Sequence, residues 1–163
     1  MVRGAVIALA ALCAFSFSGA VGQETPPETA APPGPRYEIL PMGEPLQVGQ
    51  LRYSVKRAYW DAVVESPTGE TVEYLIVEVS VRNLSAERLQ IPPFKMYDDQ
   101  GELYEPSYAK LVFPKMSLDP GEEERGRVFF LAPKDRSYWF IASGEFRSGQ
   151  FALVALEPTE PVA

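Results

Sequence analysis

The stretch YLIVEVSVRN, residues 74–83, alternates apolar and polar side chains with a period of two. On an extended chain its aliphatic side chains share one face and its polar side chains share the other. The first face carries Leu75, Val77, Val79 and Val81, and the second carries Glu78, Ser80 and Arg82. This pattern is typical of an antiparallel strand that buries one face.

The same period recurs on both sides of this stretch. In QLRYSVKRAYW, residues 50–60, we expect Leu51, Tyr53, Val55 and Tyr59 on one face and Arg52, Ser54 and Lys56 on the other. Later candidate strands cover residues 94–97, 102–104, 124–131, 138–142 and 150–156. Turn sequences separate them, namely Ser66–Gly69, Asp98–Gly101 and Asp119–Gly121. The repeated short strands predict an all-β domain over residues 37–156, either a sandwich or a small barrel.

The N-terminus has the pattern of a secretory signal peptide, which we place at residues 1–20. Arg3 supplies a positive charge, residues 5–17 are uncharged and mostly apolar, and Ser18-Gly19-Ala20 is a small-residue cleavage site. The alternative is an uncleaved membrane anchor, although the uncharged segment is only marginally long enough to span a bilayer. Leu12 precedes Cys13, whereas lipidation requires a small residue there, so we expect Cys13 to be removed with the signal. The mature chain would then form no disulfide.

Proline-rich and polar segments flank the predicted domain. Residues 21–36 contain five prolines and form either an extended spacer or a disordered tail. Residues 157–163 are polar and turn-rich, and we expect a flexible C-terminal tail.

Composition excludes several classes of function. The chain has no histidine, and its one cysteine lies in the predicted signal, so the common catalytic triads and zinc sites cannot form. After removal of residues 1–20, 22 acidic residues face 14 basic ones. An acidic chain binds nucleic acid or anionic lipid poorly, because like charges repel. We therefore predict no catalytic residues, no metal and no cofactor, and contact with a membrane only if the N-terminal segment is kept as an anchor.

Two acidic clusters are candidates for chemistry. Glu122, Glu123 and Glu124 follow a Pro-Gly turn and are either the solvated rim of a strand or a metal or acid–base site. We favour the rim, because neighbouring side chains on a strand point to opposite faces. The second cluster, Asp98, Asp99 and Glu102, lacks the spacing of an EF-hand calcium loop, so we favour a hairpin turn.

Consecutive aromatic residues are the candidates for ligand binding. Tyr59-Trp60 and Tyr138-Trp139-Phe140 place rings on opposite faces of their strands, so one ring of each set enters the core. The other ring is either exposed for a ligand or covered by a loop. The candidate ligand-binding residues are therefore Trp60, Trp139, Tyr59 and Tyr138.

Asn83 begins the sequence Asn-Leu-Ser, which is a formal acceptor for N-glycosylation. It also ends the long predicted strand, where an asparagine side chain can bond to the backbone of a turn. We favour the structural role unless the source is a eukaryote.

Three motifs in order resemble a known family. They are V-x-V-x-N-x-S from Val79, D-x-G-x-x-Y from Asp99, and L-x-P-G-x4-G-x-V-x-F-x-x-P from Leu118. Over residues 37–156 the chain resembles a family of exported bacterial immunoglobulin-like domains of unknown function, related in fold to telokin and to a small secreted mycobacterial antigen. The resemblance implies an envelope location and no catalytic residues.

From these observations we predict an antiparallel immunoglobulin-like β-sandwich of seven to nine strands that is secreted, periplasmic or attached to the cell envelope. We predict that the protein is a non-enzymatic module that binds another extracytoplasmic protein through a sheet edge or a loop end. The alternative is a module that binds carbohydrate or a small ligand through exposed aromatic rings.

Overall fold

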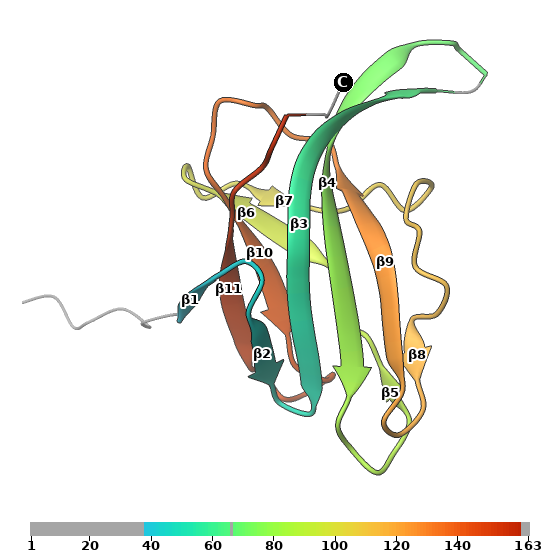
Figure 1. Ribbon diagram of the computed structural model, residues 1–163, viewed down its shortest axis with the longest axis vertical. Coiled ribbons are helices and arrows are strands. Elements are labelled where there is room, and N and C mark those ends of the chain that lie inside the picture. Colours follow the sequence, from blue (N-terminus) through green and yellow to red (C-terminus); the bar gives the residue numbers. More distant parts are fainter. Residues whose placement is uncertain (1–37, 66, 161–163) are drawn as a thin grey trace, which may run out of the picture. The chain divides into compact units, whose positions relative to one another are not determined.

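The computed structural model describes residues 38–65 and 67–160, and this part of the chain contains eleven β-strands and no helix (Figure 1). The strands are β1 (Ile39–Pro41), β2 (Pro45–Val48), β3 (Leu51–Val64), β4 (Thr71–Asn83), β5 (Leu89–Gln90), β6 (Lys95–Asp98), β7 (Leu103–Tyr104), β8 (Ser117–Leu118), β9 (Glu123–Phe130), β10 (Tyr138–Ser143) and β11 (Phe151–Leu156).

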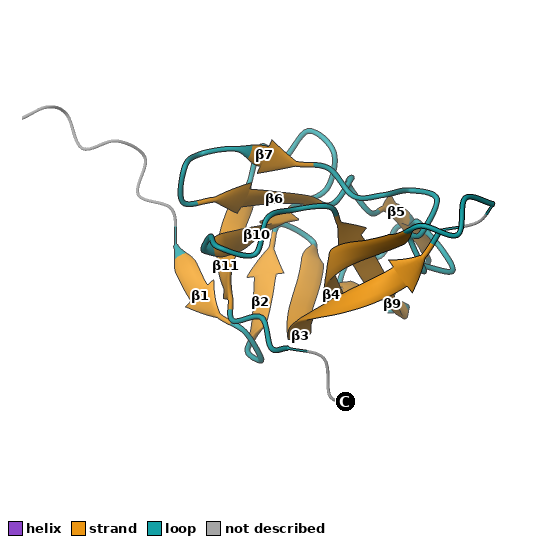
Figure 2. Cartoon of the chain, turned by 90° about the horizontal axis from the view of Figure 1, so that it is seen from above, coloured by secondary structure: helices purple, strands orange, loops and turns teal. Residues whose placement is uncertain are grey.

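The strands form two main sheets that face each other (Figure 2). One sheet has five strands in the order β1-β11-β10-β6-β7, and the other has four in the order β2-β3-β4-β9. β5 and β8 form a separate pair. Neighbouring strands are antiparallel except β1 and β11, which run parallel. The predicted all-β sandwich is confirmed, and seven of its strands have four or more residues.

β4 is the central strand of the core, as its alternation predicts. Leu75, Val77, Val79 and Val81 are all buried between the two sheets. Full burial of one aliphatic side chain stabilises the fold by about 1.5–3 kcal/mol. Because β4 pairs with β3 on one side and β9 on the other, it positions the two neighbouring strands that carry the candidate functional side chains.

β3 contains a β-bulge that a strict period of two does not predict. The register with β4 shifts between Val55 and Arg57, which leaves Lys56 as the extra residue. Beyond the bulge Trp60 enters the core and Tyr59 lies on the outer face. The prediction that Tyr59 shares the buried face of Val55 is therefore wrong, because a bulge adds a residue to one strand only.

The sandwich is tied together across its core by one tyrosine. The hydroxyl of Tyr53, on β3, donates a hydrogen bond of 2.6 Å to the carbonyl oxygen of Ser143, on β10. Tyr53 is buried, and this burial, together with the charge of Glu145, raises the pKa of Tyr53 well above its usual value. The hydroxyl therefore stays protonated and joins the two sheets.

Two of the predicted turns form as expected. Gly101 has φ +80° in the hairpin between β6 and β7, and Gly121 has φ +76° in the turn before β9. The backbone N–H of Glu122 donates to the carbonyl oxygen of Asp119 at 3.0 Å, which closes the second turn. Positive φ explains the glycine at both positions.

The outer edge of β9 is covered by the segment that precedes β8. The N–H of Val112 donates to the carbonyl oxygen of Arg127 at 3.1 Å, and the N–H of Arg127 donates back at 2.9 Å. A side chain on Gly126 would place its Cβ 2.2 Å from the Val112 carbonyl oxygen, so only glycine permits this approach. An added strand cannot pair with β9 at this point, because the backbone groups are already bonded.

The C-terminal residues are held against β3. The N–H of Trp60 donates to the carbonyl oxygen of Thr159, and the N–H of Thr159 donates to that of Ala58, both at 3.0 Å. Glu160 forms an ion pair with Lys134 at 3.1 Å. The C-terminal tail that the sequence predicts to be flexible over 157–163 is thus attached to the sandwich at Thr159 and Glu160, through contacts that sequence does not reveal.

The predicted signal peptide, residues 1–20, and the proline-rich spacer, residues 21–36, lie outside the described residues. In the part of the chain that is described, no helix has the length and apolar character needed to cross a membrane.

Candidate functional site

Two of the four predicted ligand-binding aromatics lie in the core. Trp60 is 4% exposed and Tyr138 is 1% exposed, and their rings meet edge to face with centroids 6.2 Å apart. The hydroxyl of Tyr138 donates to the carbonyl oxygen of Pro133, and burial raises the pKa of Tyr138 to about 12. We therefore correct Trp60 and Tyr138 from ligand-binding candidates to core residues, because burial leaves neither ring accessible.

The other two aromatics are half-buried and lie on different sheets. Tyr59 is on the outer face of β3, where the guanidinium of Arg57 stands 4.6 Å from its ring centroid. Trp139 points away from the core on β10, directly opposite Tyr97 of β6. Because the two outer faces of a sandwich point in opposite directions, Tyr59 and Trp139 do not form one site.

Trp139 belongs to an apolar outer face of the five-stranded sheet. The register places aliphatic and aromatic side chains beside one another on four strands and on the edge strand β1. We call this set the apolar face; it comprises Ile39, Tyr97, Leu103, Trp139, Ile141 and Leu153.

Several members of the apolar face are accessible. Tyr97 is 36% exposed, Leu103 42% and Ile39 55%. At one end of the face a groove of about 290 Å³ lies over Tyr97 and Ile141, and Ser143, Ser148 and Gln150 add polar groups to its walls. This sheet thus has apolar side chains on both of its faces.

Part of the outer face of the four-stranded sheet has the opposite chemistry, next to a covered apolar cluster that contains Tyr74, Ile76 and Phe129. Six basic side chains lie on it in register, three from β3, one from β4 and two from β9. We call this set the basic face; it comprises Arg52, Lys56, Arg57, Arg82, Arg125 and Arg127. Two acidic side chains, Glu78 and Glu123, share the same area, although the whole chain has a formal net charge of −7.

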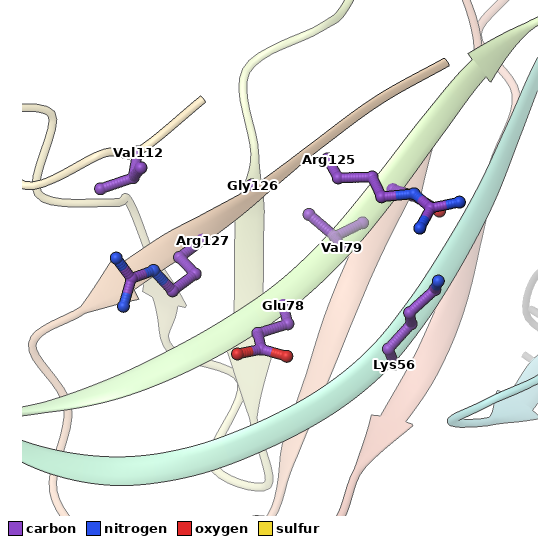
Figure 3. A pocket seen from close by; sticks show the side chains of 8 residues that line it. Lys56, Glu78, Val79, Val112, Arg125, Gly126 and Arg127 are labelled. Atoms are coloured by element: carbon purple, nitrogen blue, oxygen red, sulfur yellow. The ribbon is translucent and has the colours of Figure 1, made fainter. Parts of the chain in front are cut away.

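The basic face is hollowed along β4. A pocket of about 360 Å³ is lined by Lys56 from β3, by Glu78 and Ser80 from β4, and by Arg125 and Arg127 from β9. Figure 3 shows the three labelled basic side chains arranged around Glu78. The bulge of β3 contributes directly, because it leaves both Lys56 and its neighbour exposed. The pocket can therefore receive an anionic group from solvent.

The three consecutive glutamates do not converge on one point. Glu122 pairs with Lys115, and this hydrogen bond, with a second from the N–H of Asp119, lowers the pKa of Glu122. Glu123 pairs with Arg125 at 3.0 Å. These contacts are those of a solvated strand end, as the sequence predicts.

Asp98 is a structural residue of the β6–β7 hairpin. Its buried carboxylate accepts hydrogen bonds from the N–H groups of Gln100 and Glu102, the hydroxyl of Tyr104 and the guanidinium of Arg136. Burial opposes ionisation, but these hydrogen bonds, with that of Arg136 first, lower the pKa of Asp98 to about 2. Both carboxylate oxygens are used by the hairpin and by Arg136, which supports the hairpin interpretation over a calcium loop.

Asn83 is fully buried and holds a turn together. Its Nδ2 donates to the carbonyl oxygens of Glu87, Leu118 and Asp119 at 2.6, 3.1 and 3.2 Å. Its Oδ1 accepts from both the N–H and the hydroxyl of Ser85 at 2.8 Å. The favoured structural role is confirmed, because a glycan cannot be attached to an Nδ2 that is buried and engaged in this way.

Residues 40–152 match the family model described as "Domain of unknown function (DUF4352)", which covers more than half of the chain. The chain belongs to the DUF4352 family. The predicted resemblance to an immunoglobulin-like family of unknown function is thereby confirmed. No curated protein matches this DUF4352 chain.

Solved structures share the fold of this DUF4352 domain. The yjhA protein of Bacillus subtilis is 16% identical with a TM-score of 0.54, over 72% of this chain and 99% of that one. The secreted protein MPT63 of Mycobacterium tuberculosis is 11% identical with a TM-score of 0.53, over 77% and 100%. An uncharacterized β-sandwich protein of Clostridium difficile is 11% identical with a TM-score of 0.51, over 75% and 95%.

Proposed function

We propose that this DUF4352 protein is a non-enzymatic module of the extracytoplasmic space that binds another protein through its apolar face. The observation that carries the proposal is the chemistry of the five-stranded sheet, which presents exposed Tyr97, Leu103 and Ile39 on the side away from the core. Contiguous apolar side chains on a surface are typical of protein interaction sites.

Other features support the location and the lack of enzymatic activity. Residues 1–20 have the pattern of a signal peptide, and one protein of the same fold, MPT63, is secreted. The chain has no histidine, which removes the commonest general base. The proposed surface is a sheet face rather than the predicted sheet edge or loop end; at β9, the Val112 segment already occupies the edge beside Arg127.

A photo-crosslinking experiment tests the protein-binding proposal. A photoreactive residue at Ile141, expressed in the source cells, should give one defined adduct with a partner protein. The same residue at Gln47, on the four-stranded sheet, should give none. Tyr97→Lys should abolish the adduct at position 141, because a charge at the centre of an apolar interface is costly to desolvate. An adduct that survives Tyr97→Lys, or that forms equally from Gln47, contradicts the proposal.

The groove beside the apolar face favours a second candidate, a carbohydrate ligand. Tyr97 provides an aromatic surface there, and Ser143, Ser148 and Gln150 provide hydroxyl and amide groups. This combination of a ring and polar groups suits a sugar. Titration of a glycan panel against the intrinsic fluorescence separates the candidates, since Trp139 lies next to Tyr97. Flat titrations with every glycan would eliminate this candidate and leave the protein partner.

A further inference from the structure

The basic face forms a trough that follows β4. β4 provides the floor, and the cations of β3 and β9 stand on either side. The pocket of about 360 Å³ continues into a second hollow of about 190 Å³, since Lys56 and Ser80 line both. Strand spacing places the two flanking strands ~9.6 Å apart, and cations two residues apart on a strand are ~6.6 Å apart. The trough therefore matches a single extended chain rather than one compact molecule.

Most of the cations in the trough have no acidic partner. Among the described residues, the Glu123–Arg125 contact is the ion pair on this face, and none within 4.0 Å involves Arg52, Lys56 or Arg82. Arg52 and Arg82 are direct cross-strand neighbours, an arrangement of like charges that costs stability. A bound anion would relieve this repulsion, so the face is complementary to negative charge.

We propose that the basic face binds a linear phosphate polymer without nucleobases, lying along β4. Five of its six cations are arginines. One planar guanidinium group can donate two parallel hydrogen bonds to the oxygens of a phosphate. The hydroxyls of Ser54 and Ser80, which line the hollows, add donors at the floor. The shape favours a narrow chain over a bilayer, because a flat membrane surface does not reach the floor of a trough.

A polypeptide fits this surface less well. A peptide that adds to a sheet uses the backbone groups of an edge strand, and at β9 those of Arg127 are already bonded to Val112. On the face of the sheet its own backbone groups would be left with few partners. A phosphate polymer has no such requirement, because charge and hydroxyl contacts satisfy it.

Glu78 gives the proposal a sharp test. Its carboxylate lies in the larger pocket between β3 and β9, in register with Arg57 and Arg127. The negative charge of Glu78 repels a polyanion. Its removal leaves all six cations of the basic face in place. We therefore expect Glu78→Gln to tighten binding severalfold.

The experiment measures binding of inorganic polyphosphate to the purified protein by isothermal titration calorimetry. The double variant Arg125→Gln/Arg127→Gln should weaken binding by about tenfold or more, and affinity should fall as salt is raised from about 50 to 200 mM. The matched control is Lys95→Gln/Arg147→Gln, which removes the same charge from outside the basic face and should change the affinity by less than about twofold. Thermal melts of all variants establish that they fold.

Other outcomes would overturn the proposal. Equal loss in the control double variant would show that only the net charge matters. Tighter binding of poly-L-glutamate would assign the face to an acidic polypeptide, and tighter binding of phosphatidylglycerol vesicles would assign it to a membrane. A single-stranded oligonucleotide that binds more tightly than polyphosphate would assign it to nucleic acid. Because the basic face and the apolar face lie on different sheets, none of these results bears on the protein-binding proposal.

Discussion

At the scale of single residues, Asp98 gives the fold a specific response to acid. The pKa of its carboxyl is about 2 in the folded protein, while an aspartate in an unfolded chain titrates near ~3.9. Between these values the unfolded state binds more protons than the native state, so stability falls as the pH falls. The contribution is complete above about pH 4 and is lost as the pH approaches about 2.

We therefore predict that Asp98→Asn reduces the loss of stability in acid. Urea unfolding of the two proteins at several values from about pH 5 to pH 2 measures this difference. The variant should be less stable at the upper end, because an amide is a weaker acceptor for Arg136 and Tyr104. The two stability curves should converge toward the acid end. Parallel curves over the whole range would show that Asp98 does not carry the effect.

Asn83 is the second residue with a defined structural effect. Asn83→Ala leaves the buried carbonyl oxygen of Leu118 without its hydrogen bond, and we predict a loss of about 2–4 kcal/mol in the free energy of unfolding. Urea denaturation measures it. Ser85→Ala is the control and should cost less, because the N–H of Ser85 still reaches Asn83 Oδ1. A loss for Asn83→Ala no larger than for the control would contradict the structural role.

At the scale of elements, the bulge of β3 links the core to the basic face. Deletion of Lys56 restores the regular alternation, so Trp60 keeps its place in the core, and we predict a folded protein. Deletion of Tyr59 instead turns Trp60 toward solvent, and we expect it to cost about 4 kcal/mol or more. Chemical denaturation followed by tryptophan emission compares the two. Equal destabilisation would show that the bulge is required for folding and does not only place a cation.

The edge strands also show how elements limit function. β9 is blocked by the Val112 segment, and the glycine at 126 is what allows the segment to approach. Closed edges prevent uncontrolled strand addition. At this point β9 therefore offers no free backbone groups to an added strand.

At the scale of the whole molecule, the layered architecture separates two chemistries. One outer face carries the apolar face, the other carries the basic face beside a covered apolar cluster, and the main core lies between them. Net charge describes neither face, since a chain with a formal charge of −7 presents six cations together on one sheet. Binding of a protein on one side and of an anionic polymer on the other are therefore compatible.

This layering predicts a difference between the two tryptophans. With Trp139→Phe, the remaining Trp60 should resist quenching by acrylamide, because it is buried beside Tyr138. With Trp60→Phe, the remaining Trp139 should be quenched more strongly, since it lies half-exposed on the apolar face. Stern–Volmer constants of the two variants measure this. Equal quenching would contradict the assignment of one ring to the core and the other to the surface.

Some features of this protein follow from the sequence alone. Local alternation predicts the buried face of β4, and turn residues predict the glycine conformations at 101 and 121. The role of Asn83 follows in the same way, since its position at the end of a strand already suggests a bond to turn backbone. Each depends on neighbours a few residues away, and for that reason the sequence pattern contains it.

Other features were decided only by the tertiary structure. The strand β2 and the attachment of Thr159 have weak local signals, and they form because β3 offers backbone partners from elsewhere in the chain. The bulge at Lys56 was missed because its register is set against β4. The basic face joins Arg52 to Arg125, which are far apart in sequence. The outward alternation of arginines on these strands was a usable signal in the sequence. Only the register between strands places these arginines on one surface, and that register depends on hydrogen bonds between distant parts of the chain.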